Sequence, residues 1–315
     1  MGKVAFLFPG QGSQTVGMGK SLAESSETVH SFYQKADDAL NYSLSKIIFD
    51  GPQEELTLTT NAQPALLTTS IAILQYFKQS GIVPSYVAGH SLGEYTALVA
   101  AEAISFEEGV YTVHKRGQYM EEAVPNKEGT MAAVLGLDRM ELAKVTESVA
   151  NDGNPVQLAN INCPGQIVIS GSRKGVELAS ARAKEAGAKR VLPLEVSGPF
   201  HSSLMKPAAN RLRDVLDQIH IQEAKVPVIA NVSASIMVNP DEIRENLISQ
   251  LYSPVLWEDS IRKMIESGVD TFIEIGPGKV LSGLVKKIDR SVRTFAVSDE
   301  ETFRATSEAL KEGTQ

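Results

Sequence analysis

A serine between two glycines stands where an apolar run, 86–88, meets a helical pattern. The segment Gly89-His90-Ser91-Leu92-Gly93 has the form Gly-x-Ser-x-Gly. Glycine at both flanks permits a sharp strand-to-helix turn that exposes the serine hydroxyl at a helix N-terminus, where main-chain N–H groups favour negative charge on a neighbouring oxygen. This context predicts that Ser91 is a nucleophile. The alternative is an ordinary turn, because the short pattern also occurs by chance.

A serine hydroxyl is a poor nucleophile unless a base takes its proton. His201 follows a Gly-Pro pair at the start of a predicted helix, from which its ring can reach back toward a pocket. His90 adjoins the serine, and its ring is expected to point away. Helical segments of mixed charge contain the other histidines, His30, His114 and His220. Elimination therefore predicts that His201 is the base. No Asp or Glu stands out to orient it, and the chain continues far beyond it, unlike in the α/β hydrolases.

Two further segments have both a functional and a structural interpretation. Gln11 lies between Gly10 and Gly12 after a strand pattern, so its main-chain N–H can face a ligand at close range; otherwise the segment is only a turn. Arg116 lies among apolar positions of a helical pattern. Its guanidinium either points into a site or extends past apolar neighbours to solvent.

Strands and helices alternate along most of the chain, which predicts an α/β fold with a parallel sheet and helices on both faces. The expected strands are 4–8, 86–88, 226–230, 271–275 and 293–297, and the expected helices are 61–79, 92–101, 106–123, 206–218, 241–251, 259–266 and 280–287, with a further helix from about 301. Between 130 and 196 the order becomes β-α-β-β-α-β, the ferredoxin-like signature. Its elements are expected at 131–137, 139–150, 156–162, 166–170, 174–186 and 189–196.

This change of pattern predicts two parts in a chain of 315 residues. We expect 1–127 and 198–315 to form a large α/β catalytic domain and 128–197 to form an inserted small subdomain. The net charge of -8 and the lack of a Lys/Arg run argue against nucleic-acid binding.

The first apolar run, 4–8, is too short for a signal sequence or a membrane span. A single cysteine, Cys163, excludes an internal disulfide and fits a reducing compartment. We therefore expect a cytoplasmic protein without a membrane partner. Nothing in the sequence suggests an obligate oligomer, so a monomer is expected.

An ordered set of motifs extends along nearly the whole chain: Phe8–Gln14, Gly89–Tyr95, Arg116, Asn160–Gln166, Gly198–Ser202 and Glu274–Gly278. Together they resemble the malonyl-CoA:acyl-carrier-protein transacylases of bacterial fatty acid synthesis. The resemblance implies a hydrolase-like large domain with a ferredoxin-like insertion and an active site in the cleft between them. It further implies ping-pong transfer: Ser91 takes the malonyl group from malonyl-CoA, the phosphopantetheine thiol of acyl carrier protein then accepts it, and His201 acts as general base and then as general acid.

The resemblance also assigns the groups around the serine. It implies that the main-chain N–H groups of Gln11 and Leu92 form an oxyanion hole. A main-chain carbonyl at Gln250 would orient His201, which would account for the missing acid. The resemblance further implies that the substrates are malonyl-CoA and the phosphopantetheinylated carrier, with no metal and no bound cofactor.

The same resemblance bears on substrate selection. It implies that Arg116 holds the malonyl carboxylate through two parallel hydrogen bonds, which lysine cannot copy. Phe200 before the histidine fits a malonyl group better than a branched one. Asn160 and Asn162 either contact pantetheine or only cap their loop. Cys163 in the same loop is not expected to be a catalyst, because nothing nearby would lower its pKa.

Three other functions remain to be considered. A serine thioesterase or esterase would release free malonate without a carrier, and the absence of a triad acid argues against it. A discrete acyltransferase of a polyketide synthase or malonate decarboxylase system shares every motif. A non-catalytic scaffold is disfavoured because Ser91, His201, Arg116 and Gln11 are all present.

Docking of the carrier protein needs a local basic patch, because such carriers are typically acidic. Each candidate residue is otherwise an ordinary solvated charge. The candidates are Lys189, Arg190, Lys286, Lys287 and Arg290.

Overall fold

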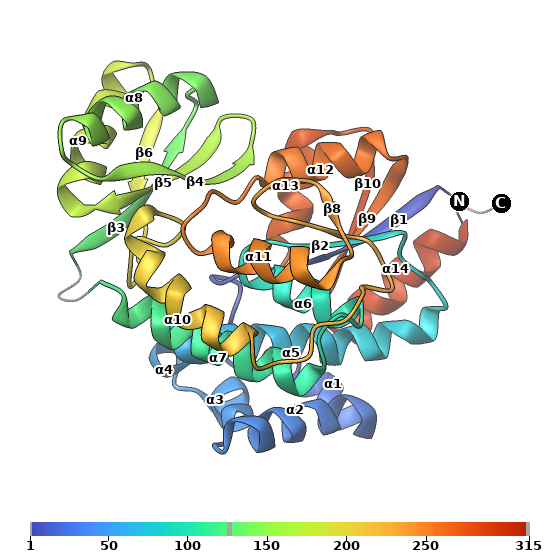
Figure 1. The fold of residues 1–315 in the computed structure, drawn as a ribbon. Helices are drawn as coiled ribbons and strands as arrows, with labels where there is room; N and C mark the ends of the chain where they lie inside the picture. Colours follow the sequence, from blue (N-terminus) through green and yellow to red (C-terminus); the bar gives the residue numbers. More distant parts are fainter. Residues whose placement is uncertain (1, 125–127, 313–315) are drawn as a thin grey trace.

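The computed structural model describes residues 2–124 and 128–312, which form two sheets surrounded by helices (Figure 1). The larger sheet has the strand order β10-β9-β1-β2-β7-β8. Five of these strands are parallel, as predicted, whereas β8 at the edge pairs antiparallel with β7 and was not expected. The strands are β1 (Lys3–Phe8), β2 (Tyr86–Gly89), β7 (Val228–Ile229), β8 (Ile236–Met237), β9 (Val269–Ile275) and β10 (Arg293–Val297).

Helices pack on both faces of this sheet, which confirms the mixed α/β prediction. Alternate residues of β1 belong to different hydrophobic cores: Val4, Phe6 and Phe8 to one, and Ala5 and Leu7 to the other. A continuous apolar run is typical of a strand buried on both sides. The helices of this part are α1 (Lys20–Ser25), α2 (Glu27–Leu40), α3 (Leu44–Asp50), α4 (Gln53–Thr57), α5 (Thr59–Phe77), α6 (Leu92–Ala100), α7 (Phe106–Glu122), α10 (Lys206–Leu216), α11 (Pro240–Gln250), α12 (Trp257–Glu266), α13 (Val280–Ile288) and α14 (Glu300–Glu312).

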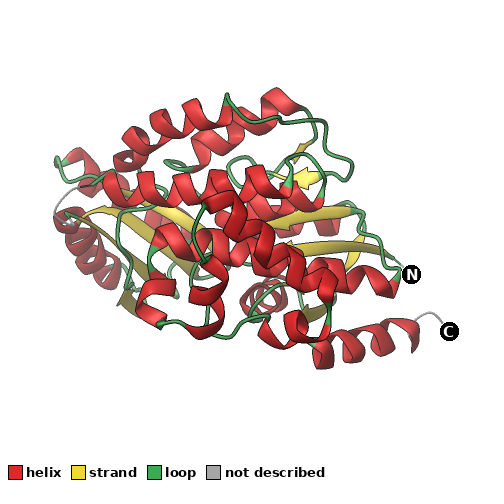
Figure 2. Cartoon of the chain, turned by 90° about the horizontal axis from the view of Figure 1, so that it is seen from below, coloured by secondary structure: helices red, strands yellow, loops and turns green. Residues whose placement is uncertain are grey.

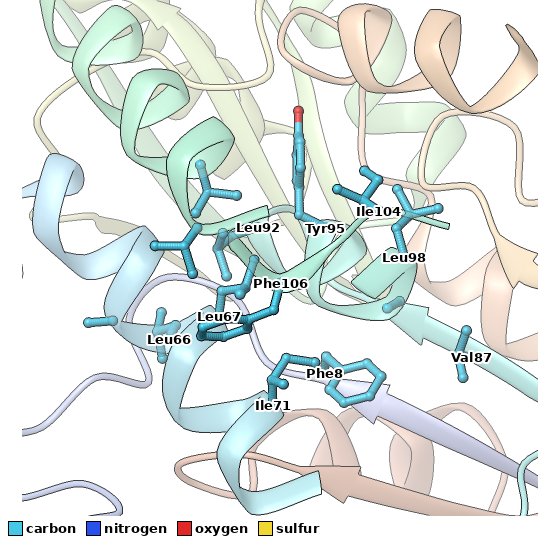
Figure 3. Packing of buried hydrophobic residues seen from close by; sticks show 14 of the residues in the cluster. Phe8, Leu66, Leu67, Ile71, Val87, Leu92, Tyr95, Leu98, Ile104 and Phe106 are labelled. Carbon is cyan, nitrogen blue, oxygen red and sulfur yellow. The ribbon is translucent and has the colours of Figure 1, made fainter. Parts of the chain in front are cut away.

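The first core anchors the turn that follows β2. Figure 3 shows Phe8 of β1 and Ile71 of α5 packed in the same cluster as Leu92 and Tyr95 of α6. Leu92 and Tyr95 have no exposed surface. Burial of an apolar side chain such as Leu92 contributes about 1.5–3 kcal/mol, so the N-terminus of α6 is held firmly against the sheet.

The smaller sheet is antiparallel and has the order β4-β5-β3-β6. Its chain order, β3-α8-β4-β5-α9-β6, is the order predicted from the sequence. Each helix begins with a side-chain cap: Asp138 accepts the N–H of Met140, and Ser172 accepts the N–H of Gly175. The elements are β3 (Gly129–Leu135), α8 (Arg139–Asn151), β4 (Val156–Cys163), β5 (Gln166–Ser172), α9 (Arg173–Glu185) and β6 (Arg190–Pro193).

Strand β4 joins the two parts of the molecule. Asn160 forms a parallel bridge with Val255 in the segment before α12. Val255 O accepts from Ile161 N at 2.9 Å, and Val255 N donates to Ala159 O at 2.8 Å.

In the view from below, helices cover strands of both sheets (Figure 2). One boundary expected from the sequence, between 127 and 128, adjoins residues 125–127, which lie outside the described residues. Among the described residues, no helix combines the length and the hydrophobicity that a membrane span requires.

Candidate active site

Ser91 lies at a sharp turn between β2 and α6. Its backbone has φ 51° and ψ -108°, a conformation that non-glycine residues rarely adopt. A Cβ on Gly89 would lie 1.8 Å from the carbonyl oxygen of Gly93, and a Cβ on Gly93 would lie 2.1 Å from that of Phe8. Both flanking positions therefore require glycine. The turn is also held by Asn231, whose Oδ1 accepts from Ser91 N at 2.8 Å.

His201 lies beside the serine hydroxyl. Its Nε2 is 2.8 Å from Ser91 Oγ, and its Nδ1 is 2.7 Å from the main-chain oxygen of Gln250. A carbonyl oxygen only accepts hydrogen bonds, so Nδ1 carries the proton and Nε2 is free to accept from the hydroxyl. Burial, together with the positive charge of Arg116, lowers the pKa of His201 to about 3. The ring is therefore a neutral base at pH 7.

Arg116 is fully buried next to the same hydroxyl. Its Nη1 donates to Gln63 Oε1 at 2.8 Å, and its Nη2 donates to Ser91 Oγ at 3.1 Å and to Gln250 Oε1 at 2.8 Å. The interpretation that its guanidinium extends to solvent is therefore wrong. No carboxylate of the described chain lies within 4.0 Å of the guanidinium. A buried cation without an ion-pair partner favours an anionic ligand.

The side chain of Gln250 links these groups to Glu94. Its Nε2 donates to Ser91 O at 2.9 Å and to Glu94 Oε2 at 2.5 Å. Glu94 is fully buried, and burial raises its pKa to about 7, although the hydrogen bond from Gln250 opposes this shift. Asn231 N donates to Glu94 Oε1 at 3.3 Å, and Asn231 Nδ2 donates to Gly89 O at 2.8 Å. The side chains of Gln250, Asn231 and Glu94 therefore form one hydrogen-bond network, which holds the turn at Ser91 and the guanidinium of Arg116 in place.

Sequence reasoning missed Gln63, Glu94 and Asn231, yet each carries a signal. Gln63 is a polar residue in the apolar stretch of α5, where it is fully buried. Asn231 follows β7, at the carboxyl end of a parallel strand, where ligand sites of α/β sheets form. Glu94 lies in the first turn of α6, next to the serine.

A cavity of about 350 Å³ opens over Ser91 and His201. Gln11, Asn160 and Phe200 also line it. No lysine or arginine of the described chain lines it. Three glutamates do line it, namely Glu54, Glu121 and Glu195.

Several sequence-predicted residues lie near Ser91 without lining this cavity. Arg116 is not among its lining residues and reaches Ser91 from within the protein. Asn162 does not line the cavity either; its Oδ1 is 2.8 Å from His90 Nε2. The main-chain N–H groups of Gln11 and Leu92 have no protein acceptor within the described residues. Leu92 is the first residue of α6, and its N–H points out of the helix start.

This arrangement can activate a serine hydroxyl to attack a carbonyl carbon and can receive an anionic group beside it. Among the residues that the structure describes, no group of three or more His, Cys, Asp or Glu could hold a metal ion. Cys163 is buried, and burial raises its pKa, so its thiol is not activated.

Residues 5–304 match the family model described as acyl transferase domain. The chain is 64% identical over 312 residues to the malonyl CoA-acyl carrier protein transacylase of Bacillus subtilis, covering 99% of this chain and 98% of the relative. A solved transacylase of that name from Clostridium perfringens has a TM-score of 0.96 at 43% identity, covering 99% of this chain and 98% of the other. A solved structure described as a type II PKS acyl-carrier protein in complex with its malonyl-transacylase has a TM-score of 0.94 at 43% identity. The match covers 98% of this chain and 99% of the other.

Replacement of Gly89 by alanine tests the packing of the turn. The added Cβ would meet the Gly93 carbonyl, so we expect Gly89→Ala to lower the free energy of unfolding by about 1–3 kcal/mol. Gly283 in α13 has open space around its Cβ position and is the matched control; Gly283→Ala should be neutral or slightly stabilising. Urea unfolding followed by circular dichroism measures both. An unchanged midpoint for Gly89→Ala would show that the turn tolerates a side chain.

Proposed function

The chain belongs to the malonyl-CoA:acyl carrier protein transacylases, within the acyl transferase family, and from this we propose how its residues perform the transfer. The enzyme is an acyltransferase that moves malonyl from malonyl-CoA to acyl carrier protein for fatty acid synthesis. We propose that Ser91 holds the malonyl group as an ester between two thiol carriers. One observation carries this proposal: Ser91 Oγ lies 2.8 Å from His201 Nε2 and 3.1 Å from Arg116 Nη2.

In the first half-reaction, His201 Nε2 takes the proton of Ser91 as Oγ attacks the malonyl thioester carbonyl. The Oγ–C bond forms, the C–S bond breaks, and Nε2 returns the proton to the sulfur of CoA. The N–H groups of Gln11 and Leu92 are proposed to stabilise the oxyanion, each by about 3 kcal/mol. Proton transfer through His201 contributes roughly 10²–10⁴ in rate.

In the second half-reaction, the phosphopantetheine thiol of the carrier gives its proton to His201 and attacks the ester. The new C–S bond forms, the bond to Ser91 Oγ breaks, and Oγ recovers the proton. One thioester replaces another, so the net reaction is close to thermoneutral. The proposed mechanism therefore uses no metal and no bound cofactor.

Arg116 is proposed to select the malonyl group. Three of its five N–H donors are engaged by Gln63, Ser91 and Gln250, which leaves two N–H groups of the guanidinium for further hydrogen bonds. An acetyl group would leave this buried charge unpaired, at a cost of about 3 kcal/mol, or roughly a hundredfold in rate. Phe200 lines the cavity and is proposed to leave room for malonyl but not for a branched acyl group. Asn160 also lines the cavity and is the better placed of the two asparagines to contact pantetheine.

We further propose that the two sheets represent a hydrolase-like large domain, 1–127 with 198–315, and a ferredoxin-like small subdomain, 128–197. The strand order of the smaller sheet supports this division. The cavity supports it as well, because it is lined from both parts, for example by Ser91 and Asn160. Docking of the carrier is proposed to use the basic candidates, among which Lys287 Nζ is already 3.0 Å from Gln166 Oε1.

The proposal includes a monomeric enzyme of the cytoplasm. Light scattering after size-exclusion chromatography tests whether the enzyme is a monomer. The similarity to a malonyl-transacylase with a type II PKS carrier makes a polyketide carrier the second candidate partner. Transfer assays with a fatty acid carrier and a polyketide carrier, compared by kcat/KM, distinguish the two.

Ser91→Ala tests the nucleophile. After incubation with malonyl-CoA, the intact mass of the wild type should rise by one malonyl group, whereas Ser91→Ala should gain no mass. Ser233, exposed in the loop between β7 and β8, provides the control Ser233→Ala, which should form the adduct normally. Adding carrier protein should discharge the adduct to malonyl-carrier, while release of free malonate instead would indicate a thioesterase. An adduct on Ser91→Ala would exclude this serine.

Arg116→Met tests selectivity, because methionine keeps much of the volume and removes the charge. We expect kcat/KM for malonyl-CoA to fall roughly a hundredfold while the ratio of acetyl to malonyl transfer rises. Arg262 on the surface of α12 pairs with Glu258, and Arg262→Met should change neither value. If the acetyl-to-malonyl ratio of Arg116→Met equals that of the wild type, Arg116 does not bind the carboxylate.

The pH dependence of acylation tests the state of the base. A lowered pKa means that His201 stays neutral through the range in which an ordinary histidine, with pKa 6.5, gains a proton. We therefore expect the acylation rate constant to show no His201 titration between about pH 5 and pH 8. Glu94, with its pKa near 7, titrates in this window, so rapid-quench rates are compared between wild type and Glu94→Gln. Half-loss of rate near pH 6.5 that persists in Glu94→Gln would contradict the prediction.

A further inference from the structure

Gln157 of β4 reaches from the smaller sheet to the backbone around His201. Its Nε2 lies 3.2 Å from His201 O and 3.3 Å from Tyr252 O, and its Oε1 accepts from Ser203 N at 3.0 Å. One amide therefore bonds to three main-chain groups of the larger part of the molecule.

These main-chain groups belong to the two segments that orient the base. His201 and Ser203 lie in the first segment, and Tyr252 lies in the second, two residues after Gln250 at the end of α11. The bond from His201 Nδ1 to Gln250 O crosses between the same two segments. The length and angle of this hydrogen bond depend on how the two segments sit relative to each other, and the Gln157 amide bonds to both segments.

The backbone of His201 itself needs such support. Its φ of 57° is left-handed, which costs a non-glycine residue about 1–3 kcal/mol and persists only where neighbouring contacts enforce it. The acceptor of His201 Nδ1 is a main-chain carbonyl, which has no side-chain torsions, so its position is set by the backbone at Gln250. The orientation of His201 therefore depends on the rigidity of the chain around it.

We propose that Gln157 is a positioning residue for the reaction: its amide holds the 201–203 and 250–252 segments together and so keeps His201 Nε2 at hydrogen-bond distance from Ser91 Oγ. This inference rests on the proposed role of His201 as the base. Displacing a catalytic group by about 1 Å can cost roughly a hundredfold in rate. The smaller sheet thereby contributes to the chemistry as well as to the wall of the cavity.

Another contact between the two parts provides a matched control. Arg139 of α8 donates to both carboxylate oxygens of Asp259 in α12, at 3.1 and 2.8 Å. It contacts neither the 201–203 segment nor the 250–252 segment. Arg139→Met removes this ion pair between the two parts without touching the support of His201.

The experiment compares wild type, Gln157→Met, Gln157→Glu and Arg139→Met in rapid-quench acylation by malonyl-CoA, without carrier. Gln157→Met removes the amide, and Gln157→Glu keeps an acceptor for Ser203 N but turns a carboxylate toward two carbonyl oxygens. We expect both to lower the acylation rate constant tenfold or more with the KM for malonyl-CoA changed less than about twofold, because Arg116 is unaltered. Arg139→Met should acylate like the wild type.

The proton NMR signal of His201 Nδ1–H, in histidine-labelled protein, provides a readout that a purely structural role would leave unchanged. It should shift or exchange faster in both Gln157 variants while their melting temperatures stay close to that of Arg139→Met. Wild-type acylation rates with an unshifted signal in both variants would overturn the proposal, as would an equal loss in Arg139→Met. If wild-type protein formed no adduct on Ser91, the proposed function would fail instead.

Discussion

A single glutamine connects the three groups on which this site depends. The main-chain oxygen of Gln250 accepts from His201, its side-chain oxygen accepts from Arg116, and its side-chain amide donates to the backbone of Ser91. In a buried setting each unmade hydrogen bond is costly, so the three groups hold one another in a single arrangement. The choice of a neutral carbonyl to orient the histidine also has an electrostatic reason. A carboxylate at that position would lie close to Arg116 and, in the proposed mechanism, would compete with the malonyl carboxylate for its positive charge.

The geometry around the serine follows from the sheet. Gln11, Ser91 and Asn231 follow β1, β2 and β7, and parallel neighbouring strands end at the same edge. The loop after β1 therefore lies beside the elbow, where a Cβ on Gly10 would meet the His90 carbonyl oxygen at 2.4 Å. Strand β4 closes the other side through its bridge to Val255. Two sheets of different type thus meet at one cavity, and the residues that contact substrate in the proposed mechanism come from both.

Much of this was predictable from the sequence because it depends on local pattern. The elbow, the alternation of strands and helices, and the βαββαβ order follow from apolar periodicity and glycine position. The short helices α1, α3 and α4 and the two-residue strand β8 carry too little periodicity to be recognised. Helix α2 has 14 residues and buries Val29, Tyr33 and Ala36 on one face, so its periodicity was present in the sequence but was missed. Long-range hydrogen bonds such as that from Ser91 N to Asn231, 140 residues away, leave no trace in local pattern. For the same reason the helix around Arg116 could not reveal whether the guanidinium faced solvent or the site, and the role of Gln250 came from resemblance alone.

Three glutamates on the cavity wall affect how a thiol carrier that bears phosphates can approach Ser91. Glu54, Glu121 and Glu195 line the wall, and the described lining residues include no lysine or arginine, so nothing there attracts a phosphate. In the proposed mechanism, the phosphates of either thiol carrier would therefore stay outside this wall, while the uncharged pantetheine portion would extend inward to Ser91. In the proposed mechanism a thioester can then arrive on the same uncharged arm from either source, because neither CoA nor the carrier protein has to bring a phosphate past this wall.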